Sequence, residues 1–88
     1  MKYYLFTYPN CPRCESLKSY LSEMNVVAEE HNLVMKESKL KVRDFLKVLK
    51  RDSKGGIIMP TLIVQNQNDI AAVCNSREEF ADWLQSKA

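Results

Sequence analysis

Apolar residues occur along the chain in stretches whose spacing predicts alternating strands and helices. Lys2–Thr7 is apolar at successive positions, which is typical of a strand covered on both faces. Val26–His31 is predicted as a second strand, and its Glu29 and Glu30 place it at the edge of a sheet. Between the two, a helix is expected from Pro12, with one apolar face made by Leu17, Tyr20, Leu21 and Met24.

The middle of the chain predicts a second helix after a polar loop that runs through Ser38. Its inward residues should be Val42, Phe45, Leu46 and Leu49. The helix is expected to end at Gly55-Gly56, because glycine forms a left-handed cap easily.

The last third predicts a hairpin and a final helix. Thr61–Gln65 and Ile70–Cys74 flank the turn-rich stretch 66–68, which indicates two antiparallel strands. Ser76 and Glu79 have the spacing of a capping box, and the helix that follows should bury Phe80, Trp83 and Leu84.

The order β-α-β-α-β-β-α predicts an α/β fold. The first three elements form a parallel unit, and the hairpin adds two antiparallel strands to the same sheet. We therefore expect a four-stranded mixed sheet with three flanking helices, distributed over both of its faces.

Composition limits the class of protein. The chain has 88 residues, 45% of them hydrophobic and 27% charged, so we expect one ordinary globular domain over residues 1–88. No apolar run approaches the roughly 20 residues of a membrane helix, and the apolar start is too short for a signal peptide. We expect a cytoplasmic monomer without membrane contact, where a reducing environment disfavours a structural disulfide framework.

The net charge is +2, but residues 36–54 carry eight basic and three acidic side chains, a local balance of 8 − 3 = +5. A basic segment can attract nucleic acid or an acidic partner. It is more often the solvated face of one helix, and with that interpretation we expect no nucleic-acid partner.

The most informative residues are Cys11-Pro12-Arg13-Cys14, where the first strand passes into the first helix. Cys11 is placed at the helix N-terminus, whose unpaired N–H groups stabilise a thiolate. Pro12 fits the first helical position, and Arg13 adds positive charge beside the thiols. Cys14 lies on the same face, close enough to form a disulfide with Cys11. A stabilised thiolate at Cys11 and a second thiol within bonding reach are the features that thiol–disulfide exchange needs.

Two other interpretations of the cysteines remain open. His31 and Cys74 would complete a Cys3His zinc set with Cys11 and Cys14. Two cysteines could also meet this spacing by chance. The position of the pair between a strand and a helix favours the redox interpretation.

Met59-Pro60-Thr61 places a proline immediately before an apolar strand. A proline at such a position either breaks the start of the strand or forms a cis peptide bond in a tight bend.

These motifs resemble the glutaredoxin family of the thioredoxin superfamily. The resemblance runs through residues 4–14, residues 59–64, the hairpin and the last helix. It implies that Cys11 is the nucleophile, Cys14 the resolving thiol and Pro60 a cis-proline that faces them. It further implies that the Met59 backbone pairs with an extended substrate segment.

The chain departs from the family at several substrate-binding positions. Tyr8 stands where glutaredoxins usually carry a lysine. The stretch Ala72-Val73-Cys74-Asn75-Ser76 stands where they carry two glycines before an acidic turn. Arg13 could replace part of the missing positive charge, and Asn75 keeps a hydrogen-bonding side chain. We expect substrate contacts at Tyr8, Arg13, Met59, Pro60, Cys74 and Asn75. For Cys74, a third redox thiol and a small buried residue are both open.

The expected function is that of a small dithiol oxidoreductase that reduces protein disulfides or glutathione mixed disulfides. It would need no bound cofactor, and its electrons would come from glutathione or a flavoprotein disulfide reductase. One alternative is a thiol-based protein that binds a metal or an iron–sulfur cluster without redox turnover. Another is an adaptor whose basic second helix docks an acidic partner. His31 is expected as a solvated edge residue and Trp83 as a packing residue.

Overall fold

The computed structural model describes residues 1–87. Its elements are β1 (Lys2–Thr7), α1 (Pro12–Glu23), β2 (Glu29–Asn32), α2 (Lys36–Val42), the 3-10 turn η1 (Arg43–Phe45), β3 (Thr61–Asn66), β4 (Asp69–Cys74) and α3 (Arg77–Lys87). The predicted order of strands and helices is confirmed. None of the helices in the described part of the chain is long and apolar enough to cross a membrane.

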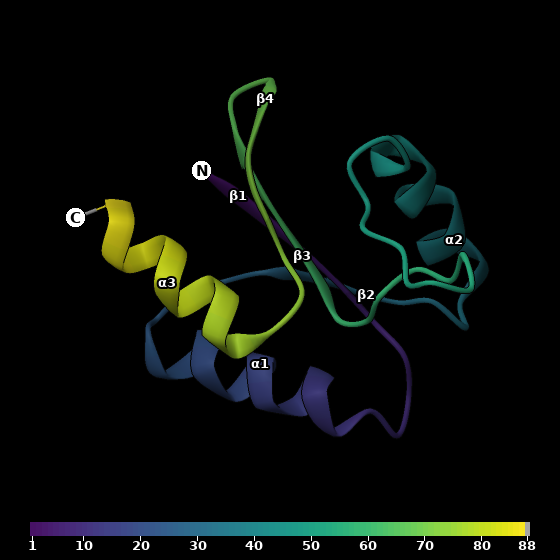
Figure 1. Ribbon diagram of the computed structural model, residues 1–88, viewed down its shortest axis with the longest axis horizontal. Coiled ribbons are helices and arrows are strands. Elements are labelled where there is room, and N and C mark those ends of the chain that lie inside the picture. Colours follow the sequence, from purple (N-terminus) through teal and green to yellow (C-terminus); the bar gives the residue numbers. More distant parts are fainter. Residues whose placement is uncertain (88) are drawn as a thin grey trace.

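The four strands form one mixed sheet in the order β2-β1-β3-β4. β1 pairs in parallel with β2 and antiparallel with β3, and β3 pairs antiparallel with β4. Helices α1 and α3 cover one face of this sheet and α2 lies over the other (Figure 1). This is the predicted α/β fold, a four-stranded mixed sheet with helices on both faces, and it is consistent with the thioredoxin-like fold that the resemblance implies.

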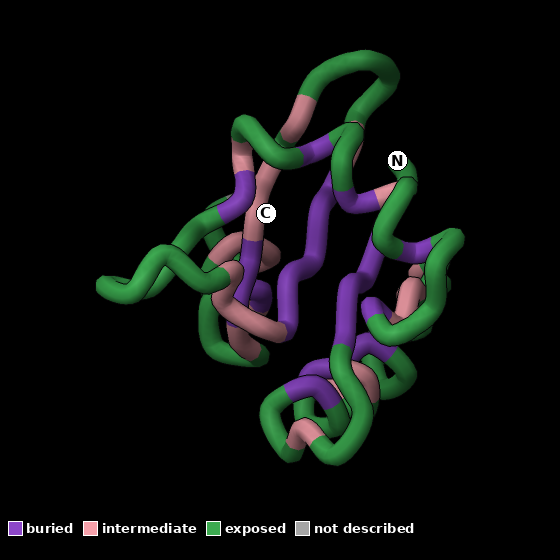
Figure 2. The backbone as a smooth tube through the Cα atoms, turned by 90° about the vertical axis from the view of Figure 1, so that its right-hand side faces the viewer, coloured by how far each residue is buried: buried purple, intermediate pink, exposed green. Residues whose placement is uncertain are grey.

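Alternate residues of the central strands supply two separate core clusters, since successive side chains of a strand point to opposite faces. The cluster on the α2 face comprises Tyr4, Phe6, Leu33, Val42, Phe45, Leu49 and Ile63. The cluster under α1 and α3 comprises Leu5, Leu17, Leu21, Leu62, Val64, Cys74 and Phe80. Buried residues therefore run along the middle strands, while exposed residues form the outer loops (Figure 2). The prediction that the first strand is covered on both faces is confirmed.

Local sequence explains both ends of α1. Asn10 adopts a φ of 56° in the turn before the helix, a left-handed conformation that asparagine tolerates, and Pro12 occupies the start of the helix. At the other end, Asn25 has a φ of 57°, and the N–H of Val26 donates to the carbonyl of Leu21 at 2.9 Å. This is a Schellman ending. The prediction that Met24 faces the core is wrong, because Met24 is the C-cap and is 47% exposed.

The second strand lies at the sheet edge as predicted, but it begins at Glu29 rather than Val26. Val27 is 90% exposed, since the chain is still leaving the end of α1 at that point. His31 is less solvated than expected: its ring stacks on Phe6, with centroids 5.4 Å apart.

The second helix differs most from its prediction. It starts at Lys36, so the loop does not continue through Ser38, which is buried within the helix. It ends at Val42 and passes into η1, so Leu46 is exposed rather than inward. Gly55 does have a positive φ of 83°, but in a separate turn where its N–H donates to the carbonyl of Asp52.

The hairpin is confirmed, and the cap of the last helix is confirmed in part. The N–H of Glu79 donates to the hydroxyl of Ser76 at 3.1 Å, as in a capping box. The Glu79 carboxylate, however, accepts from the N–H of Asn75 instead of that of Ser76. Phe80 is fully buried and Trp83 stacks on it, which agrees with the predicted packing role.

Candidate functional site

Cys11 and Cys14 form a disulfide at the N-terminus of α1, with Cα atoms 5.2 Å apart. Cys11 is the N-cap residue, and its sulfur accepts a hydrogen bond from the N–H of Cys14 at 3.2 Å. Cys11 is partly exposed, whereas Cys14 is only 1% exposed. One partly exposed and one buried cysteine in a disulfide is an arrangement that suits thiol–disulfide exchange.

Arg13 lies between the two cysteines in sequence and is exposed. Its guanidinium donates to the backbone carbonyl of Asn75 at 3.4 Å, which connects α1 to the junction of β4 and α3. The same side chain lines a cavity of about 260 Å³ together with Ser16, Ser76, Arg77 and Glu78. Neither cysteine lines this cavity, so Arg13 is its connection to the cysteine pair, and the predicted contact of Arg13 with substrate stays a prediction.

The Met59–Pro60 peptide bond is cis, so of the two interpretations of this proline the cis form is confirmed. Pro60 is buried, and the Met59 side chain packs against the core cluster on the α2 face. Thr61 is also buried, and its hydroxyl donates to the carbonyl of Ile58 at 2.7 Å. The Met59 side chain is partly buried against this cluster, and the predicted contact of the Met59 backbone with substrate stays a prediction.

Asn75 is positioned differently from its prediction as a substrate-binding side chain. It is 2% exposed, and its amide nitrogen donates to the carbonyls of Ile58 and Pro60, each at 3.0 Å. Its Oδ1 atom is buried without a hydrogen-bond partner in the described part of the chain. The amide is therefore engaged by the loop before β3 rather than open to substrate.

Glu79 and Lys50 belong to the same cluster, and the sequence analysis did not assign them to the site. One carboxylate oxygen of Glu79 accepts from the N–H of Asn75 and from the Lys50 ammonium, both at 3.1 Å. Burial alone would raise the pKa of Glu79, but these two hydrogen bonds and the charges of Lys50 and Arg13 lower it. The capping-box spacing was a signal for Glu79, whereas no pattern in the sequence pointed to Lys50.

Cys74 lies in the core cluster under α1 and α3, and it is 3% exposed. Burial, followed by the negative charge of Glu79, raises the pKa of its thiol to about 11. A thiol with a raised pKa stays protonated at neutral pH, and its burial shields it from a substrate at the surface. Its burial favours the interpretation of Cys74 as a small packed residue, and its contact with substrate stays a prediction.

Tyr8 is 47% exposed and follows the end of β1, three positions before Cys11 in the sequence. Its placement leaves the ring accessible, and its contact with substrate stays a prediction.

The Cys3His zinc set is not assembled. Among the residues that the structure describes, no group of three or more His, Cys, Asp or Glu side chains could hold a metal ion. His31 instead lies against Phe6, and Cys74 lies in the core.

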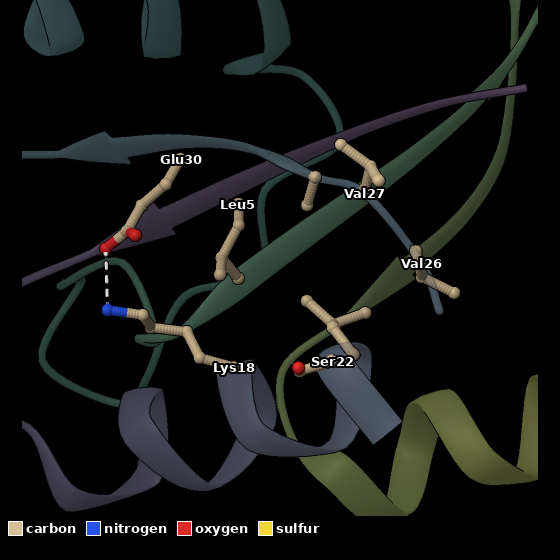
Figure 3. A pocket seen from close by; sticks show the side chains of 8 residues that line it. Leu5, Lys18, Ser22, Val26, Val27 and Glu30 are labelled. Atoms are coloured by element: carbon tan, nitrogen blue, oxygen red, sulfur yellow. Dashed lines mark ion pairs between the residues drawn. The ribbon is translucent and has the colours of Figure 1, made fainter. Parts of the chain in front are cut away.

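A further cavity, of about 290 Å³, lies between the C-terminal half of α1 and the segment leading into β2 (Figure 3). Leu5, Leu21 and Val26 contribute apolar surface, and an ion pair of 3.3 Å between Lys18 and Glu30 crosses one side. Neither cysteine of the pair lines this cavity, so it is separate from the candidate site.

Comparisons with known proteins agree with this geometry. A family model described as glutaredoxin matches residues 4–68, well over half of the chain. A solved structure described as "Structure of a malarial protein" is similar with a TM-score of 0.62 and 14% identity, covering 98% of this chain and 97% of that one. At that identity the likeness shows the fold alone. The search of curated proteins gave no match.

Proposed function

Because the chain belongs to the glutaredoxin family, we propose that it is a dithiol oxidoreductase that reduces protein disulfides or glutathione mixed disulfides. The observation that carries the proposal is the Cys11–Cys14 pair at the start of α1, in which one cysteine is partly exposed and the other is buried. The N–H of Cys14, directed at the Cys11 sulfur, and the positive end of the helix would both favour a Cys11 thiolate.

The reaction would proceed in two exchanges. The Cys11 thiolate attacks one sulfur of the substrate disulfide, so a Cys11–substrate bond forms and the first substrate thiolate leaves. Cys14, after losing its proton, then attacks the Cys11 sulfur and displaces the second substrate thiolate. The substrate gains two electrons and two protons, and the protein retains the Cys11–Cys14 disulfide.

The protein would return to its dithiol form at the expense of two glutathione thiols, which become glutathione disulfide, or of a flavoprotein disulfide reductase. Either donor is compatible with the cytoplasm, where we place the protein, and a monomer suffices for this chemistry. Tyr8 replaces the usual lysine, while Arg13, next to Cys14 in the sequence, supplies positive charge at the start of α1. Measuring turnover with each donor separately would decide between them.

Two cysteine variants test the proposal. Cys11→Ser should abolish reduction of a disulfide substrate, because it removes the nucleophile. Cys14→Ser should accumulate a mixed disulfide between Cys11 and the substrate, seen on a non-reducing gel and identified by mass. Cys74→Ala is the matched control and should retain turnover, since its thiol is buried. Equal loss in the first two variants with no trapped species would contradict the assigned roles.

A further inference from the structure

The side chain of Asn75 forms hydrogen bonds to the backbone on both sides of Met59. Its amide nitrogen donates to the carbonyl of Ile58 and to that of Pro60, the residues on either side of Met59, at 3.0 Å each. The same nitrogen lies 3.1 Å from the hydroxyl oxygen of Thr61. A single buried amide therefore fixes the backbone immediately before and immediately after Met59.

The sheet cannot supply these hydrogen bonds. Pairing between β3 and β4 ends at Leu62 opposite Cys74, and Pro60 lies beyond that point. A buried carbonyl without a donor costs roughly 1–3 kcal/mol, so the Pro60 carbonyl needs a partner from elsewhere. Asn75 is the residue that follows Cys74, and its side chain continues the hydrogen bonding of β4 past the end of the strand.

Asn75 is itself held in a closed ring of hydrogen bonds. Its N–H donates to Glu79, and the same Glu79 oxygen accepts from the Lys50 ammonium, both at 3.1 Å. The ring closes because the N–H of Ile58 donates to the backbone carbonyl of Lys50 at 3.1 Å. Arg13 joins from α1 through its bond to the Asn75 carbonyl. Four parts of the chain, α1, the loop at Lys50, the loop before β3 and α3, thus meet at Asn75.

We propose that Asn75 is a positioning residue that fixes the Met59 backbone for pairing with an extended substrate segment, and that Glu79 and Lys50 hold it in place. This inference rests on the proposed function, since it assigns a role in substrate binding at the same site. It differs from a role in the chemistry, because the Asn75 amide is buried against the loop and has no contact with either sulfur among the described interactions.

The test compares two disulfide substrates of different size in single turnover by the reduced protein. One is a short unstructured peptide whose cysteine is linked to thionitrobenzoate, and the other is the small symmetric disulfide of thionitrobenzoate without a peptide. Release of thionitrobenzoate reports both reactions. Only the peptide can pair with the Met59 backbone.

Asn75→Ala should raise the half-saturating concentration of the peptide about tenfold, which corresponds to the loss of one or two hydrogen bonds that hold the loop. Its rate with the small disulfide should stay within about twofold of wild type, since Cys11 is unchanged. Asn68→Ala, in the exposed hairpin turn, is the matched control and should change neither value.

Three results would overturn the inference. An unchanged half-saturating concentration for the peptide would show that Asn75 does not position the segment. A parallel loss with both substrates would show general damage to the fold instead. If wild type reduces neither substrate, the proposed function fails and the inference falls with it, an outcome that differs visibly from the first two.

If Asn75→Ala does not fold, Lys50 provides a second route, because its side chain is 51% exposed and its loss should not unfold the protein. Lys50→Met should raise the half-saturating concentration of the peptide about two- to threefold, since an exposed ion pair contributes little. Lys50→Arg should restore the wild-type value. No effect of Lys50→Met, or no recovery in Lys50→Arg, would count against the ring as a positioning device.

Discussion

Alkaline pH should destabilise the oxidised protein through one buried thiol, that of Cys74. Burial and the charge of Glu79 raise its pKa to about 11 in the folded protein. In the unfolded chain the same thiol ionises near ~8.5. Between these values the unfolded chain releases a proton that the folded protein retains. The free energy of unfolding therefore falls as the pH rises through this window.

The size of this effect follows from the two pKa values of the Cys74 thiol. At a pH of about 10.5, nearly all of the unfolded thiol is ionised and only about a quarter of the folded thiol, so folding loses about 2–3 kcal/mol relative to neutral pH. That is a large share of the roughly 5–15 kcal/mol by which a small domain is stable.

The assay is urea unfolding of oxidised wild type and Cys74→Ala at neutral and alkaline pH. The Cys11–Cys14 disulfide keeps those two sulfurs out of the titration. Lysine and tyrosine side chains titrate in both proteins, so the difference between them isolates the thiol of Cys74. Wild type should lose about 2–3 kcal/mol more than Cys74→Ala between the two conditions. Parallel losses would refute the reasoning, because they would mean that the thiol ionises equally in folded and unfolded protein.

The remaining predictions concern stability and can be read from denaturation midpoints. Phe80→Ala should destabilise the protein by about 3–5 kcal/mol, because Phe80 is fully buried; a loss under about 1 kcal/mol would contradict its place in the core. Leu49→Ala should cost about 2–4 kcal/mol and Leu46→Ala less than about 1 kcal/mol, whereas equal losses would favour the longer predicted helix. Glu79 has a lowered pKa in the folded protein, so its carboxylate stabilises the fold above the ordinary pH range of glutamate ionisation, and this stabilisation is lost as the pH falls through the folded pKa. Glu79→Gln should therefore weaken the decrease of the unfolding free energy at acid pH. An unchanged decrease would exclude Glu79 as its source.

The sheet was predictable because its strands carry strong periodic signals. In Lys2–Thr7, apolar side chains occupy both odd and even positions, and the two hairpin strands flank an evident turn. The first strand and the hairpin were therefore predicted correctly. The extent of the second helix could not be predicted in the same way. Its apolar positions indicate which side chains could face the core, but they do not show at which residue the helix ends. The switch to η1 turns Leu46 outward.

The cysteine pair was predictable for a related reason, since its chemistry depends on local spacing. Cys11, Pro12 and Cys14 are fixed by one turn of helix, and that turn forms as expected. Asn75 and Lys50 act through partners far away in the sequence: Asn75 bonds residues 14 to 17 positions away, and Lys50 bonds Glu79 across 29 positions. Spacing along a single chain carries no information about such contacts, so the roles of these residues appear only once the sheet has brought them together.

The alternation of β1 and β3 between two core clusters determines which changes in chain length the protein can tolerate. A single residue inserted into β1 would exchange the side chains meant for α2 with those meant for α1 and α3, because the strand repeat is two residues. The hairpin turn between Asn66 and Asp69 is free of this constraint, since its residues are exposed and enter neither cluster. Affinity tags, reporter domains or new chain termini are therefore best introduced at residues 67–68, where added length leaves both halves of the core in register.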